Sequence, residues 1–317
     1  MRAGGPDIDG GLGIAGSGAI GPLDDVRRFS HEAMATVFEV YAVHPDERYA
    51  AQAAQAAFDL VDRLERELSR FRSNSDIARV NHLAVGESAR LGSPAMECLL
   101  IARHVYELTG GAFDIAIGTG LTSLELDAED SSVRATRDGV RVDLGGIGKG
   151  YAVDLMAELL EDWGIERALV HGGFSSVLAL EAGGGDGWPL TLSDPAAPSR
   201  VLTRVSVRQT ALSASGVRKS DHILDPRTGA PVRGRRAAWV ALPRPEQARA
   251  EAGAADGPRI AAGAVTDALT TAFMLLGSEE IAALCESSPG LEAWVLTEPD
   301  EGQPAEAGLL HFGGPPD

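Results

Sequence analysis

The sequence predicts an α+β fold in which mixed and antiparallel sheets pack against helices, and not a Rossmann fold. Of its 317 residues, 44% are hydrophobic and 23% are charged, as in ordinary globular proteins. Segments with helical periodicity and short strand-like runs both occur, without the strict strand–helix alternation of a doubly wound sheet. Between residues 177 and 210, strand-like runs are separated only by turns at 183–185 and 193–195, which favours antiparallel pairing.

The two ends of the chain are rich in glycine, proline and acidic residues that follow no period. We expect disordered tails over 1–22 and 298–317 and a single folded domain over 23–297. A mobile insertion is predicted at about 244–262, where Ala, Arg, Pro and Gly dominate. Residues 16–21 match the dinucleotide fingerprint, but no strand precedes them and no helix begins inside them, so a flexible tail is the better interpretation.

In the first half of the body, residues 37–43 predict a strand. Residues 50–71 predict a helix because apolar side chains recur at three- and four-residue spacing. Pro94 suits the first turn of a second helix, which runs to Gly110. Residues 140–144 predict a short strand that leads into a glycine cluster.

In the second half, a helix is predicted over 151–163, ending at Gly164, followed by a strand at 168–171. The short strands over 177–210 come next, and another strand is predicted at 238–242. A helix over 265–276 ends at Gly277, and a further helix and a strand at 291–296 close the body.

Composition excludes several classes of function. With 46 acidic and 28 basic residues, the net charge of -18 has the wrong sign for a nucleic-acid-binding protein. The two cysteines, Cys98 and Cys285, lie in apolar helical stretches and cannot form a disulfide framework. Because there is no signal peptide, no lipidatable cysteine near the start and no long apolar run, we expect a cytoplasmic protein unless the start codon is mis-set.

The cluster Asp143-Leu-Gly-Gly-Ile-Gly-Lys-Gly150 lies at a predicted strand-to-helix turn. It is not a P-loop, because Asp143 replaces the first glycine and Gly150 replaces the metal-binding hydroxyl. Glycines at such a turn still let backbone amides approach an anion at a helix N-terminus, with Lys149 beside it. The alternative is a tight turn with a solvated lysine.

Asp267 and Thr271 lie four residues apart on the predicted helix 265–276, and therefore on one face. A carboxylate and a hydroxyl are oxygen ligands of the kind that Mg²⁺ takes, with water and phosphate completing its shell. The alternative is a carboxylate favoured by the helix dipole and a threonine that bonds back to its own helix.

The densest polar run is residues 213–231, and it contains His222. His222 is a candidate general base because its ordinary pKa lies near neutrality, and a structural histidine is the alternative. Residues 225–229 predict a turn, and residues 111–114 a helix exit followed by a strand. The HExxH, CxxC and GxSxG patterns of zincins, zinc ribbons and α/β-hydrolases do not occur.

Taken together and in order, several segments resemble the ApbE family, the FAD:protein FMN transferases. The resemblance is carried by 34–36, 68–71, 75–81, 110–114, 143–154, 171–173, 222–231 and 266–277. It implies an ApbE-like, T-fold-like α+β body that binds FAD and Mg²⁺. It also implies an activity: transfer of FMN from FAD to a Ser or Thr hydroxyl of an acceptor protein, with release of AMP.

The resemblance also implies roles for individual residues. His222 is the base, and the metal ligands are Asp267, Thr271 and the backbone carbonyl of Gly146. The flavin nucleotide site is lined by Met34, Phe71, Ala112, Phe113, Asp114, Asp143, Lys149 and Ile223. Phe71 or Phe113 is expected to stack on a ring of FAD.

Four positions depart from the family pattern: Ala35, where glycine is usual, and Ile115, His171 and Phe174. Two alternatives to the transferase stay open. One is a Mg²⁺-dependent FAD pyrophosphatase, which would give FMN and AMP with water as the acceptor. The other is a flavin-binding protein without catalysis. A Rossmann oxidoreductase is a remote third.

Overall fold

The fold is built on one large antiparallel sheet. The computed structural model describes residues 12–14, 26–116, 118–173, 175–181, 187–216, 223–244, 261–298 and 308–314. The strands of the large sheet are β2 (Val26–Ala33), β3 (Thr36–Val43), β7 (Arg167–Gly172), β8 (Ser176–Glu181), β11 (Thr210–Gly216), β12 (Arg235–Pro243), β13 (Glu292–Thr297) and β14 (Leu309–Phe312). Their order across the sheet is β14-β13-β12-β11-β8-β7-β3-β2, and every neighbouring pair is antiparallel. The predicted α+β fold is confirmed.

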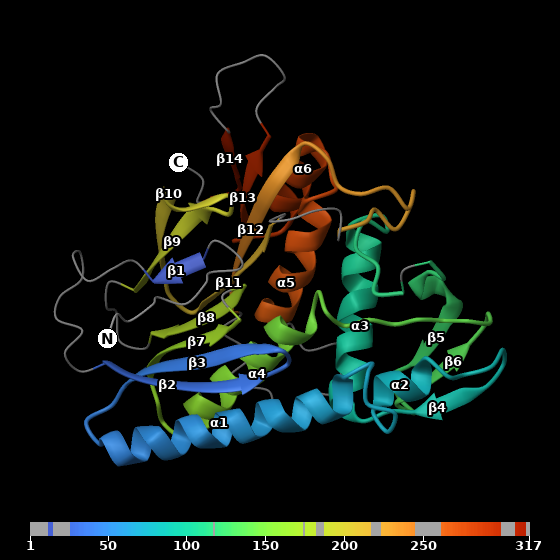
Figure 1. Ribbon diagram of the computed structural model, residues 1–317, viewed down its shortest axis with the longest axis horizontal. Coiled ribbons are helices and arrows are strands. Elements are labelled where there is room, and N and C mark those ends of the chain that lie inside the picture. Colours follow the sequence, from blue (N-terminus) through green and yellow to red (C-terminus); the bar gives the residue numbers. More distant parts are fainter. Residues whose placement is uncertain are drawn as a thin grey trace.

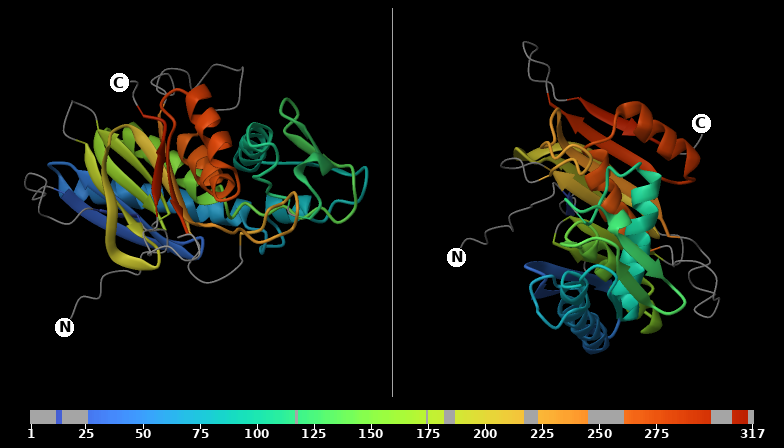
Figure 2. Two further views of the ribbon diagram at one scale, coloured as in Figure 1. Left: turned by 90° about the horizontal axis from the view of Figure 1, so that it is seen from above. Right: turned by 90° about the vertical axis from the view of Figure 1, so that its right-hand side faces the viewer.

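Helices cover one face of this sheet (Figure 1). They are α1 (Glu47–Leu68), α4 (Gly148–Asp162) and α5 (Ala262–Phe273), and α3 (Ser93–Leu108) packs against α5 and α1; α2 (Asp76–Val80) and α6 (Ser278–Ser287) are shorter. Helix α4 packs on β7 and β8, and α5 packs on β11 and β12 and lies against α4. Figure 2 shows this layer from two further directions. The contact between α4 and α5 positions the site described below.

The other face of the sheet is covered by a smaller sheet of β1 (Leu12–Ile14), β9 (Trp188–Asp194) and β10 (Ala197–Val207). Alternate residues of β8 point to opposite faces, so Leu178 packs under the helices and Val177 packs with Trp188 and Trp239 on the other side. A third sheet, made of β4 (Ser88–Arg90), β5 (Leu124–Asp127) and β6 (Ser132–Ala135), lies beyond α3, with a short 3₁₀ turn at Leu121–Ser123 (Figure 1).

The structure corrects the predicted tails. Within the segment 298–317, β14 pairs with β13, and within 1–22, β1 pairs with β9. Each is a run of three or four residues among glycines, too short to show a period, and each forms because a neighbouring strand offers free backbone groups. Apart from residues 298, 308, 313 and 314, the remaining residues of both tails and residues 245–260 of the insertion lie outside the described residues.

The predicted strand at 140–144 is also wrong. This segment joins no sheet, and the side-chain amide of Asn81 takes the place of a neighbouring strand. Asn81 Nδ2 donates to the carbonyl of Val142 at 3.0 Å, and its Oδ1 accepts from the Val142 amide at 2.6 Å. In the part of the chain that the structure describes, no helix combines the length and apolarity needed to cross a membrane.

Candidate active site

Two cavities meet at the N-terminal end of α4. The first has a volume of about 440 Å³ and lies between the start of α4, α5, β11 and the loop at 112–115. The second, of about 240 Å³, extends past the end of α1 to the turn between β2 and β3. Asp143, Gly145 and Lys149 line both cavities. The two cavities therefore form one elongated site with these three residues at its centre.

The predicted site residues gather here. Ala112, Phe113, Asp114, Asp143, Gly146, Lys149, Ile223, Asp267 and Thr271 line the first cavity, and Met34 and Phe71 line the second. His222 lies outside the described residues, but Ile223, which follows it in the chain, lines the first cavity. Residues far apart in the sequence are thus brought to one place by the packing of α4 and α5 against the sheet.

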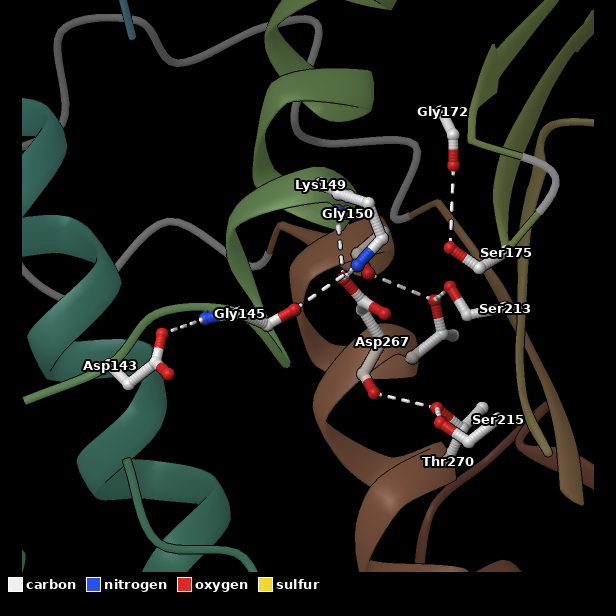
Figure 3. Close-up of polar contacts among 12 residues, drawn as sticks. Asp143, Gly145, Lys149, Gly150, Gly172, Ser175, Ser213, Ser215, Asp267 and Thr270 are labelled. Atoms are coloured by element: carbon white, nitrogen blue, oxygen red, sulfur yellow. Dashed lines mark hydrogen bonds and ion pairs between the residues drawn. The ribbon is translucent and has the colours of Figure 1, made fainter. Parts of the chain in front are cut away.

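Helix α5 presents two different faces to its surroundings (Figure 3). Thr266 and Thr270 face β11, where their hydroxyls lie 2.9 Å from the hydroxyls of Ser213 and Ser215 respectively. Both threonines also donate to their own helix, Thr266 to the Gly263 carbonyl at 3.0 Å and Thr270 to the Asp267 carbonyl at 2.7 Å. The next residue along in each case, Asp267 and Thr271, lines the cavity instead.

The Asp267 carboxylate is only 3% exposed and lies at the N-terminus of the neighbouring helix α4. Its Oδ2 accepts from the Gly150 amide at 3.1 Å and lies 3.9 Å from the Lys149 ammonium, as Figure 3 shows. Asp267 is in the second turn of α5, so the helix dipole that favours its charge is that of α4 and not its own. The alternative interpretation of the sequence assumes that the dipole of Asp267's own helix favours its charge.

Thr271 offers a hydroxyl to the cavity. Within the described residues, its Oγ1 has no hydrogen-bond partner, in contrast to Thr266 and Thr270. A Cβ added at Gly146 would lie 3.5 Å from Thr271 Oγ1 and 3.3 Å from the ring of Phe113, so the Gly146 backbone lies directly beside this hydroxyl. A carboxylate, a hydroxyl and a backbone carbonyl are hard-oxygen donors of the kind that Mg²⁺ takes.

The glycine cluster lets α5 pack directly against the start of α4 and lets the Lys149 side chain reach the backbone of Gly145. A Cβ at Gly150 would overlap the Gly263 carbonyl oxygen and lie 2.8 Å from Asp267 Cβ, so α5 requires glycine at this position of α4. Lys149 is not freely solvated, because its ammonium donates to the Gly145 carbonyl at 3.1 Å and the side chain is about a quarter exposed. These contacts hold one positive charge at the centre of the site.

Two aspartates organise the loops that border the first cavity. Asp143 Oδ1 accepts from the Gly145 amide at 3.0 Å, and its Oδ2 lies 3.4 Å from the Arg70 guanidinium. Asp114 Oδ1 accepts from the amides of Ala116 at 2.7 Å and Leu121 at 3.2 Å, which closes the loop between them. Hydrogen bonds to backbone amides thus orient both carboxylates at the border of the first cavity.

The two aromatic candidates differ in exposure. The Phe113 side chain is 3% exposed and packs against Gly146, whereas Phe71 is 83% exposed at the second cavity. The Arg70 guanidinium lies 4.6 Å from the centroid of the Phe71 ring. Phe71 is therefore the one of the two with a ring face available for stacking on a ligand.

Met34 is held in an unusual backbone conformation at the β2–β3 turn. Met34 and Ala35 have φ angles of 50° and 58°, in the left-handed region that favours glycine. The Met34 amide donates to Glu65 Oε2 at 3.2 Å, which ties this turn to α1. The structure thus gives a physical reason why glycine suits the position of Ala35.

The other departures from the family pattern lie in different environments. Ile115 lines the first cavity, and its carbonyl accepts from the Asp143 amide at 2.8 Å. His171 is 2% exposed on β7, where burial, assisted by Arg28, lowers its pKa to about 3, so its ring is neutral. His171 is not among the residues that line either cavity, and Phe174 lies outside the described residues.

Sequence reasoning missed part of the cavity wall. Ser175, Ala214, Ser215, Gly216, Leu224 and Pro226 also line the first cavity, and Arg70 and Glu65 line the second. Strand β11 was not predicted beyond residue 210, because Ser213 and Ser215 make this segment part of the polar run 213–231. Ser213 and Ser215 are polar because they face threonines of α5.

Comparison with known proteins gives a consistent result. The family model described as the ApbE family matches residues 34–122 and 119–256. A protein named FAD:protein FMN transferase from Klebsiella pneumoniae is 25% identical over 67% of this chain and 72% of its own length. Another of that name from Vibrio cholerae is 22% identical over 89% of this chain and 90% of its own length.

A solved structure shares the fold. The flavin transferase ApbE from Vibrio cholerae superposes with a TM-score of 0.72 at 20% sequence identity, over 90% of this chain and 97% of that one. Since the family model covers more than half of the sequence, the chain belongs to the ApbE family.

Proposed function

We propose that this protein is an FAD:protein FMN transferase. It moves the FMN half of FAD to a Ser or Thr hydroxyl of an acceptor protein and releases AMP. Membership of the family and the names of its relatives support this activity. The observation that carries the proposal is the meeting of two cavities at Asp143, Gly145 and Lys149. A dinucleotide needs such a site, with room for a ring system on each side of a central pyrophosphate.

The centre of the site suits a pyrophosphate. Backbone amides at the start of α4 and the Lys149 ammonium supply positive potential in a chain of net charge -18. We assign Asp267, Thr271 and the Gly146 carbonyl as the ligands of Mg²⁺. These residues would hold Mg²⁺, which would supply positive charge to offset that of a pyrophosphate.

The two cavities then hold the two ring systems of FAD. Met34 and Phe71 line one side, and Ala112, Phe113 and Ile223 line the other, with Asp114 holding the adjoining loop. The exposed ring of Phe71 can stack on any aromatic ligand. Asp143 fixes the backbone of Gly145 between the two sides.

The chemical step is a substitution at phosphorus. We assign His222 as the base that takes the proton from the acceptor hydroxyl while its oxygen attacks the phosphorus of the FMN half. A new P–O bond forms to the acceptor, the P–O bond to AMP breaks, and AMP leaves with the bridging oxygen. Lys149 lies where it can offset the negative charge that develops on the leaving phosphate.

The test is incubation of the purified protein with FAD, Mg²⁺ and a candidate acceptor, such as a redox protein encoded beside it. We expect AMP release together with an FMN adduct on one Ser or Thr, detected by mass spectrometry. Free FMN and AMP without an adduct would favour the pyrophosphatase. Tight FAD binding with no AMP, unchanged in His222→Ala, would contradict both enzymes and favour a binding protein.

A further inference from the structure

Each of the helices α4 and α5 supplies an aspartate that accepts hydrogen bonds from N-terminal amides of the other helix. Each helix has a glycine at the crossing point, Gly150 or Gly263, and an aspartate four residues later, Asp154 or Asp267. Asp154 of α4 accepts from two amides of α5, Gly263 at 2.8 Å and Ala264 at 2.9 Å. Asp267 of α5 accepts from the Gly150 amide of α4 at 3.1 Å. The two helices are thus joined reciprocally through the same five-residue pattern.

The crossing leaves little freedom for one helix to shift against the other. A Cβ at Gly263 would lie 2.6 Å from the Gly150 carbonyl oxygen and 3.0 Å from Asp154 Oδ1. Because the two backbones touch directly, neither helix can shift toward the other at this point.

Asp154 acts as the N-terminal cap of α5. The residue at the N-cap position of α5 is Ala261, which has no side-chain acceptor, and the amides that such a cap would bind are those bound by Asp154. Asp154 is 4% exposed and is not among the residues that line either cavity. It therefore acts on the site only through α5.

We propose that Asp154 is a positioning residue for the metal site. By fixing the start of α5 against α4, Asp154 sets Asp267 and Thr271, about one and two turns further along, relative to Gly146 and Lys149. This inference rests on the proposed function, since it assumes that Asp267 and Thr271 bind Mg²⁺. Groups outside the ligand shell that orient ligands typically change metal affinity by about 10- to 100-fold.

The test uses Asp154→Asn, which has the same shape. Its amide group can accept only one of the two backbone hydrogen bonds and directs an N–H donor at the other amide. The probe is ADP, which has the adenosine and pyrophosphate of FAD but no flavin to transfer. Mg²⁺ is titrated into the protein saturated with ADP, and the rise in unfolding temperature is recorded. The Mg²⁺ concentration for half of the rise should increase about ten-fold, while ADP binding without metal stays unchanged.

The matched control is Asp46→Asn. Asp46 caps α1 by accepting from the Tyr49 amide at 3.0 Å, on an exposed helix end that lines neither cavity. This variant should lose stability without a change in Mg²⁺ dependence. An unchanged Mg²⁺ dependence in Asp154→Asn, or an equal change in Asp46→Asn, would overturn the inference. A wild-type protein with no Mg²⁺ response would instead contradict the metal site itself.

A rescue experiment covers the case in which a variant folds poorly. In Asp154→Ala, a second change of Ala261→Ser places a hydroxyl acceptor at the N-cap of α5, within reach of the same two amides. The double variant should regain most of the Mg²⁺ affinity that Asp154→Ala loses. Recovery of the unfolding temperature without recovery of Mg²⁺ affinity would contradict the inference that Asp154 acts on the metal site through the cap of α5.

Discussion

The two polar faces of α5 have the same sequence spacing and opposite environments. Thr266 and Thr270 lie four residues apart, as do Asp267 and Thr271. The first pair is buried against β11, and each of its hydroxyls bonds both to a serine and to its own helix. The second pair lines the cavity beside Gly146 and Lys149. Spacing brings groups to one face, but only the neighbouring element decides whether they are structural or available to a ligand.

The largest effect is expected at Asp267. Asp267→Asn keeps an oxygen that can accept from the Gly150 amide, so the fold should survive, but it removes the charge that faces Lys149 and the proposed metal. We expect AMP release from FAD to fall by about 100-fold or more. The rate is measured chromatographically, with far-UV circular dichroism as a check on folding. Retention of more than about a third of the rate would place the chemistry elsewhere.

The pH dependence of folding stability tests how Asp154 holds the start of α5. Burial raises the pKa of Asp154 from 3.8 to about 7, although the amides of Gly263 and Ala264 oppose this. Glu158 raises the pKa slightly further, and Arg244 lowers it. Because the folded state binds this proton more tightly than the unfolded state, stability falls as the pH rises from about 4 to about 7.

The Asp154→Asn variant has no titratable group at this position, so its free energy of unfolding should lack this pH dependence. Relative to the variant, the wild-type protein should lose on the order of a few kcal/mol of unfolding free energy across this pH range. Urea denaturation of both proteins at several pH values measures the difference. Parallel pH profiles for the two proteins would show that Asp154 has the same pKa in the folded and unfolded states.

A smaller effect is expected on the face of α5 that packs on the sheet. Thr270→Val keeps the shape but removes the hydrogen bonds to Ser215 and to the Asp267 carbonyl. We expect a loss of about 1 kcal/mol in unfolding free energy, measured by urea denaturation. AMP release should stay close to that of the wild type. A large loss of activity at unchanged stability would mean that both faces of α5 serve the reaction.

The smallest effect is expected away from α5, at Ala35. Its φ of 58° is strained for alanine, and Ala35→Gly removes that strain. Glycine also has greater conformational freedom in the unfolded chain, which opposes this gain. The net increase in unfolding free energy should therefore be no more than about 1 kcal/mol. Thermal denaturation measures it. The Mg²⁺ dependence of AMP release should not change, because this turn lies in the second cavity, apart from α5.

Much of the fold could be predicted because its helices are long and strongly periodic. Helix α1 begins three residues before the prediction and ends three residues earlier than predicted, and α4 and α5 each begin three residues earlier. The missed edge strand β2 has polar residues at most positions, because one edge and one face meet solvent. The short strands of the third sheet were missed because three or four residues show no clear period.

The candidate site was predictable as a set of residues but not as an arrangement. The resemblance named Asp267, Lys149 and Gly146, and the packing brings them together. The contact of Gly150 with Gly263 and Asp267 could not be predicted, because it joins segments more than 100 residues apart with no pattern linking them. The role of Asp154 depends on that contact and so appears only in the folded structure.

The most direct test compares Thr271→Val with Thr270→Val in one assay. AMP release from FAD is measured as a function of Mg²⁺ concentration for both variants and for the wild type. We predict that Thr271→Val needs about ten-fold more Mg²⁺ while Thr270→Val follows the wild-type curve. Equal Mg²⁺ dependence in all three proteins, or a change in Thr270→Val alone, would contradict the assignment of the cavity-facing pair to the metal.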